Sequence, residues 1–348
     1  MNWVKIGDAP EQGNYITKTA EKIRPEGLKK TREVHPGDLI LSNSMSFGRP
    51  YIMAIDGCIH DGWLLIRDEE KRYDLKFLCQ MLGTEQMLAQ YRAMAAGSTV
   101  NNLNKELVGN TEVKVPSIAE QAKIGEYFSK VDDLITLHQK KFEQLTILKK
   151  YMLQKMFPQN GSDKPEIRFD GFTDDWEQRK VSELFKVTRG YVLAATLTEP
   201  AKTDEMPYPV YSSQTKDNGL MGYYKDYLYE DAITWTTDGA NAGTVNYRAG
   251  KFYCTNVCGV LLSNEVTANQ MIAEALNNVA KGYVSYVGNP KLMNNVMADI
   301  EIMIPTHAEE REKLSVFFRN LDNLITLHQQ KCDELRNAKK FMLQNMFI

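Results

Sequence analysis

The sequence predicts an α/β (α+β) protein in which two domains are joined by a pair of long antiparallel coiled-coil helices. Three observations lead to this fold class. A helix-forming segment occurs twice, short strand-like runs precede each copy, and 348 residues suffice for two domains with cores of their own. The expected domains are residues 1–115 and 159–304, and the expected helices are residues 116–158 and 305–348.

The repeated segment covers residues 131–157 and 321–347, which align without a gap and are identical at 16 of 27 positions. Their offset is 190 residues. The similarity extends upstream to Pro116 and Pro305, with one residue inserted in the second copy. A repeat of this length indicates an internal duplication, and it sets the expected domain boundaries.

Apolar residues in both copies alternate in steps of four and three, which is the pattern of a coiled-coil seam. Roughly forty residues at 1.5 Å each predict helices about 60 Å long. Because neither helix can bury its apolar stripe alone, we expect the two to pack together as a spacer between the domains. The predicted helix-pair seam consists of Phe128, Ile135, His138, Leu145, Phe318, Ile325, His328 and Leu335.

Two polar residues, His138 and His328, fall within this apolar seam. One interpretation is a metal or proton site across the helix pair, and the other, which we favour, is a polar pair that fixes the register. The C-terminal halves of the helices are also rich in lysine. This predicts either a basic face for phosphates or an acidic partner, or an ordinary solvated surface. The lysines are Lys140, Lys141, Lys149, Lys150, Lys155, Lys331, Lys339 and Lys340.

Each domain contains short strand-like runs, then an amphipathic helix, and then a strand that leads into the proline before the long helix. In the first domain the runs are residues 37–44, 50–56 and 62–67, the helix is 74–94, and the closing strand lies within 97–116. In the second domain the runs are residues 231–239, 243–248, 251–256 and 259–264, the helix is 268–284, and the closing strand lies within 288–305.

Bulk composition limits the function classes. The net charge is −3, so DNA binding must depend on local charge or on a partner. No run approaches the ~20 apolar residues of a membrane span, and the N-terminus has no signal-peptide pattern, which predicts a cytoplasmic protein without membrane contact. Five scattered cysteines indicate free thiols. Cys254 and Cys258 lack a second Cys/His pair, so we expect buried thiols and no metal.

Several motifs resemble the specificity subunits of Type I restriction-modification systems (the HsdS family) over nearly the whole chain. The helix ends KKYMLQKMFP and KKFMLQNMF resemble the repeated central and C-terminal segments of that family. Residues 169–185, FDGFTDDWEQRKVSELF, resemble the opening of its target recognition domains, and residues 235–261 resemble their central β-structure.

This resemblance implies a DNA-binding subunit that is not itself an enzyme. Each target recognition domain would read one half of a bipartite site in double-stranded DNA. The helices would fix the gap and dock two modification (methyltransferase) subunits, and restriction/translocase subunits would add cleavage. S-adenosylmethionine, ATP and Mg are then expected on the partner subunits, with no cofactor in this chain. The sequence contains neither a GxxxxGK[ST] loop nor an Asn-Pro-Pro-aromatic motif.

The first domain departs from this pattern. The second unit, 159–348, has 190 residues, and the first, 1–158, has 158. Nothing in the first unit matches residues 176–180, and residues 3–6 resemble a strand that should come later. We therefore expect a first target recognition domain that is truncated at its N-terminus. The alternative function is an assembly or remnant form that binds the modification subunit but reads one half-site or none.

Hydroxyl, amide and basic side chains contact base edges and phosphates, and such residues gather in turns of both domains, although polar turns are common on any protein surface. The first-domain candidates for DNA binding are Ser42, Asn43, Ser44, Ser46, Arg49 and His60. The second-domain candidates are Tyr211, Ser212, Ser213, Gln214, Lys216, Thr236, Thr237, Asn241, Asn246, Tyr247, Arg248 and Lys251.

Overall fold

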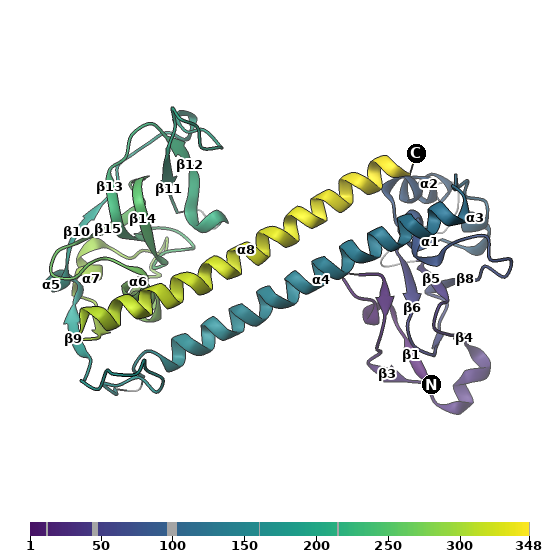
Figure 1. Cartoon of the computed structure of the whole chain (residues 1–348), viewed down its shortest axis with the longest axis horizontal. Helices are drawn as coiled ribbons and strands as arrows, with labels where there is room; N and C mark the ends of the chain where they lie inside the picture. Colours follow the sequence, from purple (N-terminus) through teal and green to yellow (C-terminus); the bar gives the residue numbers. More distant parts are fainter. Residues whose placement is uncertain (12, 44–47, 96–102, 160, 214–215, 348) are drawn as a thin grey trace. The chain divides into compact units, whose positions relative to one another are not determined.

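The computed structural model describes residues 1–11, 13–43, 48–95, 103–159, 161–213 and 216–347 (Figure 1). These residues form two compact units. Unit 1 consists of Met1–Glu143 together with Thr326–Ile348, and unit 2 consists of Gln144–Ile325. Each unit therefore contains one end of both long helices, whereas the sequence boundaries assigned each helix as a whole. None of the described helices combines the length and the apolar character that crossing a bilayer requires.

Unit 1 contains two four-stranded sheets. In the first sheet the central strand β5 (Leu39–Ser42) pairs antiparallel with β6 (Pro50–Met53) and β8 (Trp63–Ile66), and β2 (Tyr15–Ile16) lies parallel to β6. All three strand-like runs predicted for this domain are thus confirmed. The second sheet has the order β3-β1-β7-β4, and its strands are β1 (Asn2–Val4), β3 (Glu21–Lys22), β4 (Arg32–Val34) and β7 (Gly57–Ile59).

The helix predicted over residues 74–94 is two helices, α1 (Leu75–Leu82) and α2 (Glu85–Ala95). The chain breaks where Gly83 ends α1 and Thr84 caps α2, because the Thr84 hydroxyl accepts the Met87 N–H at 3.4 Å. The side chain of Asp74 caps the start of α1 by accepting the Phe77 N–H at 2.9 Å. A short helix, α3 (Lys105–Gly109), follows.

Unit 2 is built on a six-stranded sheet of order β10-β15-β13-β14-β11-β12. The runs predicted at 243–248 and 251–256 form one strand instead of two, because Gly250, at φ +70°, accommodates the register shift opposite Asp231. The strands are β10 (Phe185–Arg189), β11 (Tyr208–Tyr211), β12 (Leu220–Tyr224), β13 (Tyr229–Thr236), β14 (Val245–Cys254) and β15 (Cys258–Ser263).

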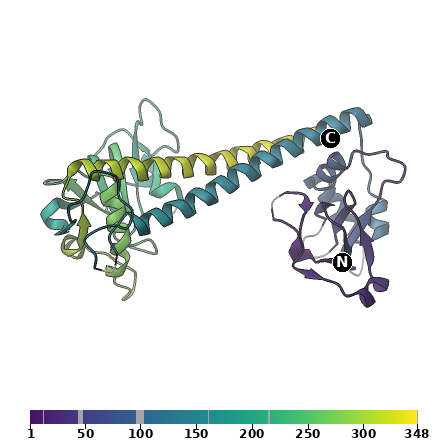
Figure 2. The ribbon, with the colours of Figure 1, turned by 60° about the horizontal axis from the view of Figure 1, so that its bottom comes forward.

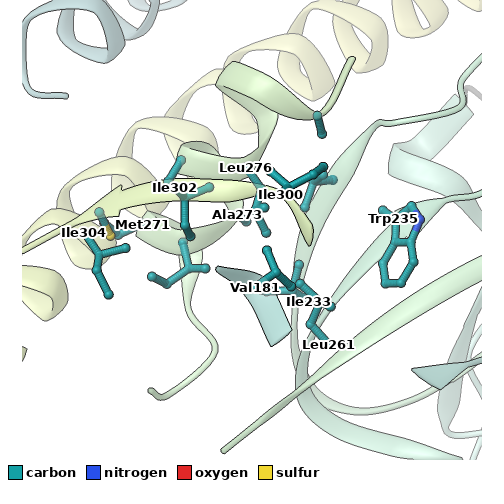
Figure 3. Packing of buried hydrophobic residues seen from close by; sticks show 14 of the residues in the cluster. Val181, Ile233, Trp235, Leu261, Met271, Ala273, Leu276, Ile300, Ile302 and Ile304 are labelled. Carbon is teal, nitrogen blue, oxygen red and sulfur yellow. The ribbon is translucent and has the colours of Figure 1, made fainter. Parts of the chain in front are cut away.

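One face of this sheet is covered by α6 (Gln270–Val279), which is shorter than the predicted helix because a 3-10 turn, Ala280–Tyr283, follows it. The core packs Ile233 and Trp235 of β13 with Met271 and Leu276 of α6 (Figure 3). Unit 2 also contains β9 (Glu177–Lys180), α5 (Val181–Leu184), α7 (Asn294–Asp299) and β16 (Glu301–Ile304).

The two closing strands differ. In unit 2, β16 is present and pairs antiparallel with β9, from Glu301 opposite Lys180 to Ile304 opposite Glu177. In unit 1 the corresponding residues 112–115 are described but form no strand, so that prediction is wrong. The physical reason is that a strand needs a partner, and among the described residues no strand of unit 1 pairs with residues 112–115 as β9 pairs with β16 in unit 2.

The long helices are α4 (Ile118–Lys155) and α8 (Ala308–Met346), as the repeat predicted. Within each unit they run in opposite directions (Figures 1 and 2). In unit 1, Lys339 of α8 donates to Asp132 of α4 at 2.6 Å. In unit 2, Lys149 of α4 donates to Asp322 of α8, also at 2.6 Å. The fold class, mixed domains with paired antiparallel helices, is confirmed.

Candidate nucleic-acid interface

The polar residues predicted in unit 2 are organised around Arg248 of β14. Its guanidinium lies over the Tyr211 ring at 3.7 Å from the ring centroid. Nε donates to the Thr234 hydroxyl at 3.0 Å, and a terminal N–H donates to the Asn218 carbonyl at 2.6 Å. Arg248 thus holds β11 and the turn before β12 against the central strands of the sheet.

Arg248 is only 8% exposed, so it lies in the interior of the cluster and not on its surface. Burial lowers the pKa of this guanidinium from its ordinary value. The group stays cationic at neutral pH, because an arginine titrates far above that range. Its Nε and one terminal nitrogen donate to protein acceptors and its face lies over a tyrosine ring, and we therefore assign it a structural role in shaping the loops.

Three loops meet around this arginine. The Asn241 amide donates to the Ser213 carbonyl at 3.0 Å, and the Thr255 hydroxyl donates to the Ser212 hydroxyl at 3.0 Å. The Thr255 N–H also donates to the Tyr211 carbonyl at 2.9 Å. We call Tyr211, Ser212, Ser213, Asn241 and Asn246 the loop cluster. Each of these side chains is partly exposed, and each is a hydroxyl, an amide or a phenol that can exchange hydrogen bonds with a base edge.

Asn246 belongs to this face of β14 by strand alternation. Residues 246 and 248 point to one side of the strand, whereas Val245 and Tyr247 pack with the α6 core. Tyr247 is therefore separated from the loop cluster, and its hydroxyl donates to Asp231 at 3.3 Å. Lys251 is separated as well: it is exposed, and its ammonium lies 4.6 Å from the centroid of the Tyr227 ring.

The other predicted residues of unit 2 are less available. Thr236 and Thr237 are buried, and the Thr237 hydroxyl donates to Asp238 at 2.7 Å. Gln214 lies outside the described residues, and so does the side chain of Lys216.

The sequence did not single out Tyr191, which is 61% exposed at the rim of the loop cluster. Its N–H donates to the Cys254 carbonyl at 3.1 Å, directly beside Thr255. Gly190 makes this approach possible, since a Cβ there would lie 2.2 Å from that carbonyl oxygen. The signal was a basic residue, a glycine and a tyrosine in succession, Arg189 to Tyr191, at the end of a strand.

In unit 1, Ser42 is buried, and its hydroxyl accepts the Arg49 N–H at 3.0 Å. The Asn43 amide donates to the Asp61 carbonyl, and His60 Nδ1 accepts the Gly62 N–H at 2.8 Å. The Arg49 guanidinium donates to the Glu11 carbonyl and lies over the Tyr51 ring. The described candidates of unit 1 are thus all bonded to other groups of the same unit. Ser44 and Ser46 lie outside the described residues.

The seam histidines meet directly. His138 Nδ1 lies 2.8 Å from His328 Nδ1, so one ring donates and the other accepts. Both residues are half-buried, near Cys332, whose thiol contacts the Ile135 carbonyl at 3.7 Å. Within the described part of the chain, no group of three or more His, Cys, Asp or Glu side chains could hold a metal ion. Of the other seam residues, Phe128, Phe318 and Ile135 are buried, and Leu145, Ile325 and Leu335 are half-buried.

Several of the helix lysines are engaged in ion pairs. Lys149 contacts Glu274 and Asp322, and Lys155 and Lys331 contact Glu166 and Glu334. Burial alone would lower the pKa of Lys149, but the two carboxylates raise it above its ordinary value. These pairs reduce the basic face that the sequence suggested.

All five cysteines are free and buried, which confirms the expectation of free thiols. Burial raises the pKa of Cys258 to about 11 and that of Cys79 to about 12. Cys254 shifts in the same direction for the same reason. Thiols in this state are inert as nucleophiles and poor as metal ligands.

Comparisons with known proteins agree with this architecture. The sequence pattern of the Type I restriction modification DNA specificity domain matches residues 3–146 and again residues 173–337. A putative type I specificity subunit N-terminus from Mycoplasma pneumoniae is 40% identical over 126 residues, which is 35% of this chain and 66% of that protein. A putative type I specificity subunit from the same organism is 31% identical over 172 residues, covering 49% of this chain and 46% of that protein. The chain thus spans about half to two thirds of the length of these relatives.

Among solved structures, the S subunit of a Type I restriction-modification system from M. genitalium is similar in fold, with a TM-score of 0.75 at 16% identity. The similarity covers 100% of this chain and 92% of that chain. Fold and repeat define a class of protein with two β-rich domains built around duplicated long helices. This chain belongs to the Type I restriction modification DNA specificity domain family, as its motifs indicated.

Proposed function

We propose that this protein is the DNA-recognition subunit of a Type I restriction-modification complex. The observation that carries the proposal is the loop cluster of unit 2. Arg248 holds β11 and the turn before β12 against the sheet, and the partly exposed residues Asn241 and Asn246 lie beside them. A buried brace under exposed polar side chains pre-orders a surface for reading base edges, which lowers the entropy cost of binding.

Within this proposal the residues have different tasks. Asn241 and Asn246 have amides of the type that pairs bidentately with adenine, and Ser213 has a hydroxyl that suits any base. Lys251 and Arg189 are exposed cations that would contact phosphates and position the domain without reading sequence. Tyr191 adds an aromatic surface at the rim.

The chain itself would perform no chemistry. The buried thiols are poor nucleophiles, and the side chains of the loop cluster are hydroxyls, amides and a phenol. Adenine methylation would belong to two modification subunits that carry S-adenosylmethionine. Cleavage would belong to restriction/translocase subunits that use ATP and Mg. The helix pair would dock the modification subunits, and the two units would read the halves of a bipartite site.

The test is to co-express the chain with its modification subunit and to map adenine methylation across the host genome. A split motif with a fixed gap is expected. The variant Asn241→Ala with Asn246→Ala should lose methylation or change the half-site attributed to unit 2. A matched control is Gln329→Ala, a surface amide on α8 that contacts Asp333. Absence of methylation by the unaltered chain with an active partner would overturn the proposal.

One observation favours a second candidate function. Residues 112–115 of unit 1 form no strand, while their counterpart in unit 2 is a paired strand. A first unit with an incomplete sheet suits an assembly form that reads only one half-site. In the same experiment this form gives a half motif or a symmetric motif in place of a split one.

A further inference from the structure

Apolar side chains gather on the surface of unit 2 between residues 283 and 293. Tyr286 is 70% exposed and Val287 is 92% exposed, and Tyr283 and Met293 on either side are about half exposed. Among the described residues, Val287 is the most exposed of the large hydrophobic side chains. Single exposed apolar residues are ordinary on a protein surface, but a contiguous group of them marks a contact site.

A hydrogen-bonded base holds the two most exposed residues. Ser285 and Lys291 exchange both of their backbone hydrogen bonds, at 2.8 and 2.9 Å, and so close the loop that residues 286–290 form. A loop this short, with its ends paired, has few alternative conformations. Tyr286 and Val287 are the exposed apolar pair of this closed loop, and we call them the apolar tip.

The base of the loop is bound to the turn that contributes Asn241 to the loop cluster. The Gly239 N–H donates to the Pro290 carbonyl at 2.9 Å, and the Leu292 N–H donates to the Thr237 carbonyl at 2.9 Å. Asn241 lies two residues beyond Gly239 in that turn. The apolar tip is thus fixed to the same turn as one of the amides that we propose for reading bases.

The other side of this turn packs against the residues that precede the loop. Gly243 has a φ of +80°, and a Cβ there would lie 2.8 Å from the Val284 side chain. Glycine is therefore needed at this point for two reasons, the backbone conformation and the close approach. The turn is held between residues 280–284 and residues 290–292, so the apolar tip and the loop cluster share one scaffold.

Two lysines, Lys281 and Lys291, precede and follow the apolar tip in the chain, and both are exposed. The Lys291 ammonium lies 3.6 Å from the Asp238 carboxylate, but this pair is half exposed and therefore weak. Cations beside an apolar protrusion suit a partner with anionic groups outside and flat apolar surfaces inside. A DNA duplex has this chemistry, because its phosphates surround a stack of bases.

We propose that the apolar tip is a wedge that enters a base step of double-stranded DNA beside the bases read by the loop cluster. This inference rests on the proposed function. Tyr286 would stack on a base of the opened step, and Val287 would fill the space between the separated bases. The closed loop favours this role, because a wedge that is already ordered loses little conformational freedom on insertion.

Such a wedge would give the recognition subunit a second task. A DNA methyltransferase must extrude its target base from the stack, and this extrusion costs unstacking energy. A base step that is already opened beside the recognised bases would lower that cost for the modification subunit. The chain would then prepare the DNA as well as choose the site.

The test measures DNA untwisting by the chain in complex with its modification subunit. A closed circular plasmid is relaxed by a topoisomerase in the presence of the complex, and its linking number is then compared with that of plasmid relaxed alone. The unaltered complex should lower the linking number. The double variant Tyr286→Ser with Val287→Ser should still bind the plasmid through phosphate contacts but should lose about half of this change or more.

Three further variants separate the wedge from other effects. Leu197→Ser, at a 53% exposed apolar site elsewhere in unit 2, is the matched control and should untwist DNA as the unaltered chain does. Tyr286→Phe keeps the aromatic ring and should also untwist normally. Two glycines inserted after Gly288 keep both apolar side chains but loosen the loop, so untwisting should fall. The melting temperature of each point variant should stay unchanged, since the altered side chains are exposed.

The outcomes distinguish the wedge from the proposed function. Plasmid binding without a change in linking number, or a change that the double variant keeps in full, would overturn the wedge and leave the proposed function intact. An unaltered complex that binds no plasmid would overturn both. Failure of the double variant to assemble with the modification subunit would overturn the wedge and assign the apolar tip to that protein contact.

Discussion

Lys149 of α4 reaches Asp322 of α8 at 2.6 Å, and the repeat reproduces this contact with the partners exchanged. Lys339 corresponds to Lys149 and Asp132 to Asp322, and Lys339 reaches Asp132 at 2.6 Å. Each unit thus holds the end of one helix against the beginning of the other by the same ion pair. In each unit a glutamine amide also donates to the aspartate of this ion pair: Gln80 donates to Asp132, and Gln270 donates to Asp322.

The two pairs should differ in their contribution to stability. Lys149 also contacts Glu274, which is 4% exposed, so Lys149→Met removes the counter-charge of two carboxylates, one of them buried, and leaves them only the Gln270 amide. Loss of such a partner costs roughly 3–5 kcal/mol of unfolding free energy. Lys339→Met should cost less, because it removes the counter-charge of a single, half-buried carboxylate, Asp132. Denaturant unfolding of both variants measures the difference, and equal losses would contradict it.

The histidine pair should couple the two helices. Replacing either His138 or His328 by Ala leaves the other ring half-buried without its partner. A double-mutant cycle should therefore give a coupling free energy of about 1 kcal/mol. Zinc is the control: a metal site would raise the melting temperature on addition of zinc in the unaltered chain, whereas a pair that only fixes register would leave it unchanged.

Substitutions of Arg248 and Lys251 should separate effects on the stability of unit 2 from effects on DNA binding. Arg248→Lys loses the stacked, forked guanidinium and should lower the melting temperature of unit 2 together with methylation. Lys251→Ala removes an exposed cation and should leave the melting temperature unchanged. In DNA titrations it should reduce the salt dependence by about one phosphate contact. If Arg248→Lys melts normally, the brace assignment is wrong.

The thiols should not react with a thiol reagent until the protein unfolds. Burial raises the pKa of Cys258 to about 11 and that of Cys79 to about 12, so the thiolate is scarce near neutral pH. Titration with a chromogenic disulfide reagent should give almost no reaction in buffer and five equivalents in denaturant. Rapid reaction of the folded chain would contradict the burial of these groups.

Acid should weaken unit 1 through Asp38. The hydrogen bonds from Arg67, at 2.7 and 2.9 Å, hold the pKa of Asp38 below its ordinary value. A lowered pKa contributes stability that is present above the unfolded pKa, near 4, and is lost as the pH falls through the folded value. The melting temperatures of the unaltered chain and of Asp38→Asn should therefore converge as the pH falls from about 5 through the folded pKa of Asp38.

The periodicity of apolar residues predicted which helices and strands form better than it predicted where they break or continue. The strands around Leu39, Pro50 and Trp63 and both long helices follow from local patterns of apolar residues. The break at Thr84 and the continuity of β14 through Gly250 depend on single caps and bulges that a periodic pattern does not resolve.

The sequence predicted which types of residue form the candidate site, but not how those residues are arranged in space. Arg248 looked like a surface cation, since nothing local indicates that Tyr211, 37 positions earlier, lies under its guanidinium. Its burial follows from the parallel pairing of β11 with β14, which is a long-range relationship. Because Trp235 points into the core, strand alternation places its neighbour Thr234 on the opposite face of the sheet. Asn246 lies opposite Thr234 on β14 and shares that face.

Phe347 has a consequence for the order of synthesis. It packs against Phe77 and Phe128 in a cluster of buried residues that includes strands near the N-terminus of unit 1. A ribosome delivers this residue last among those described, so the domain translated first cannot finish its core until translation has reached the end of α8. Unit 2, a continuous stretch from residue 144 to residue 325, can close earlier. Although domains generally fold in order from the N-terminus, this chain should complete the second one first.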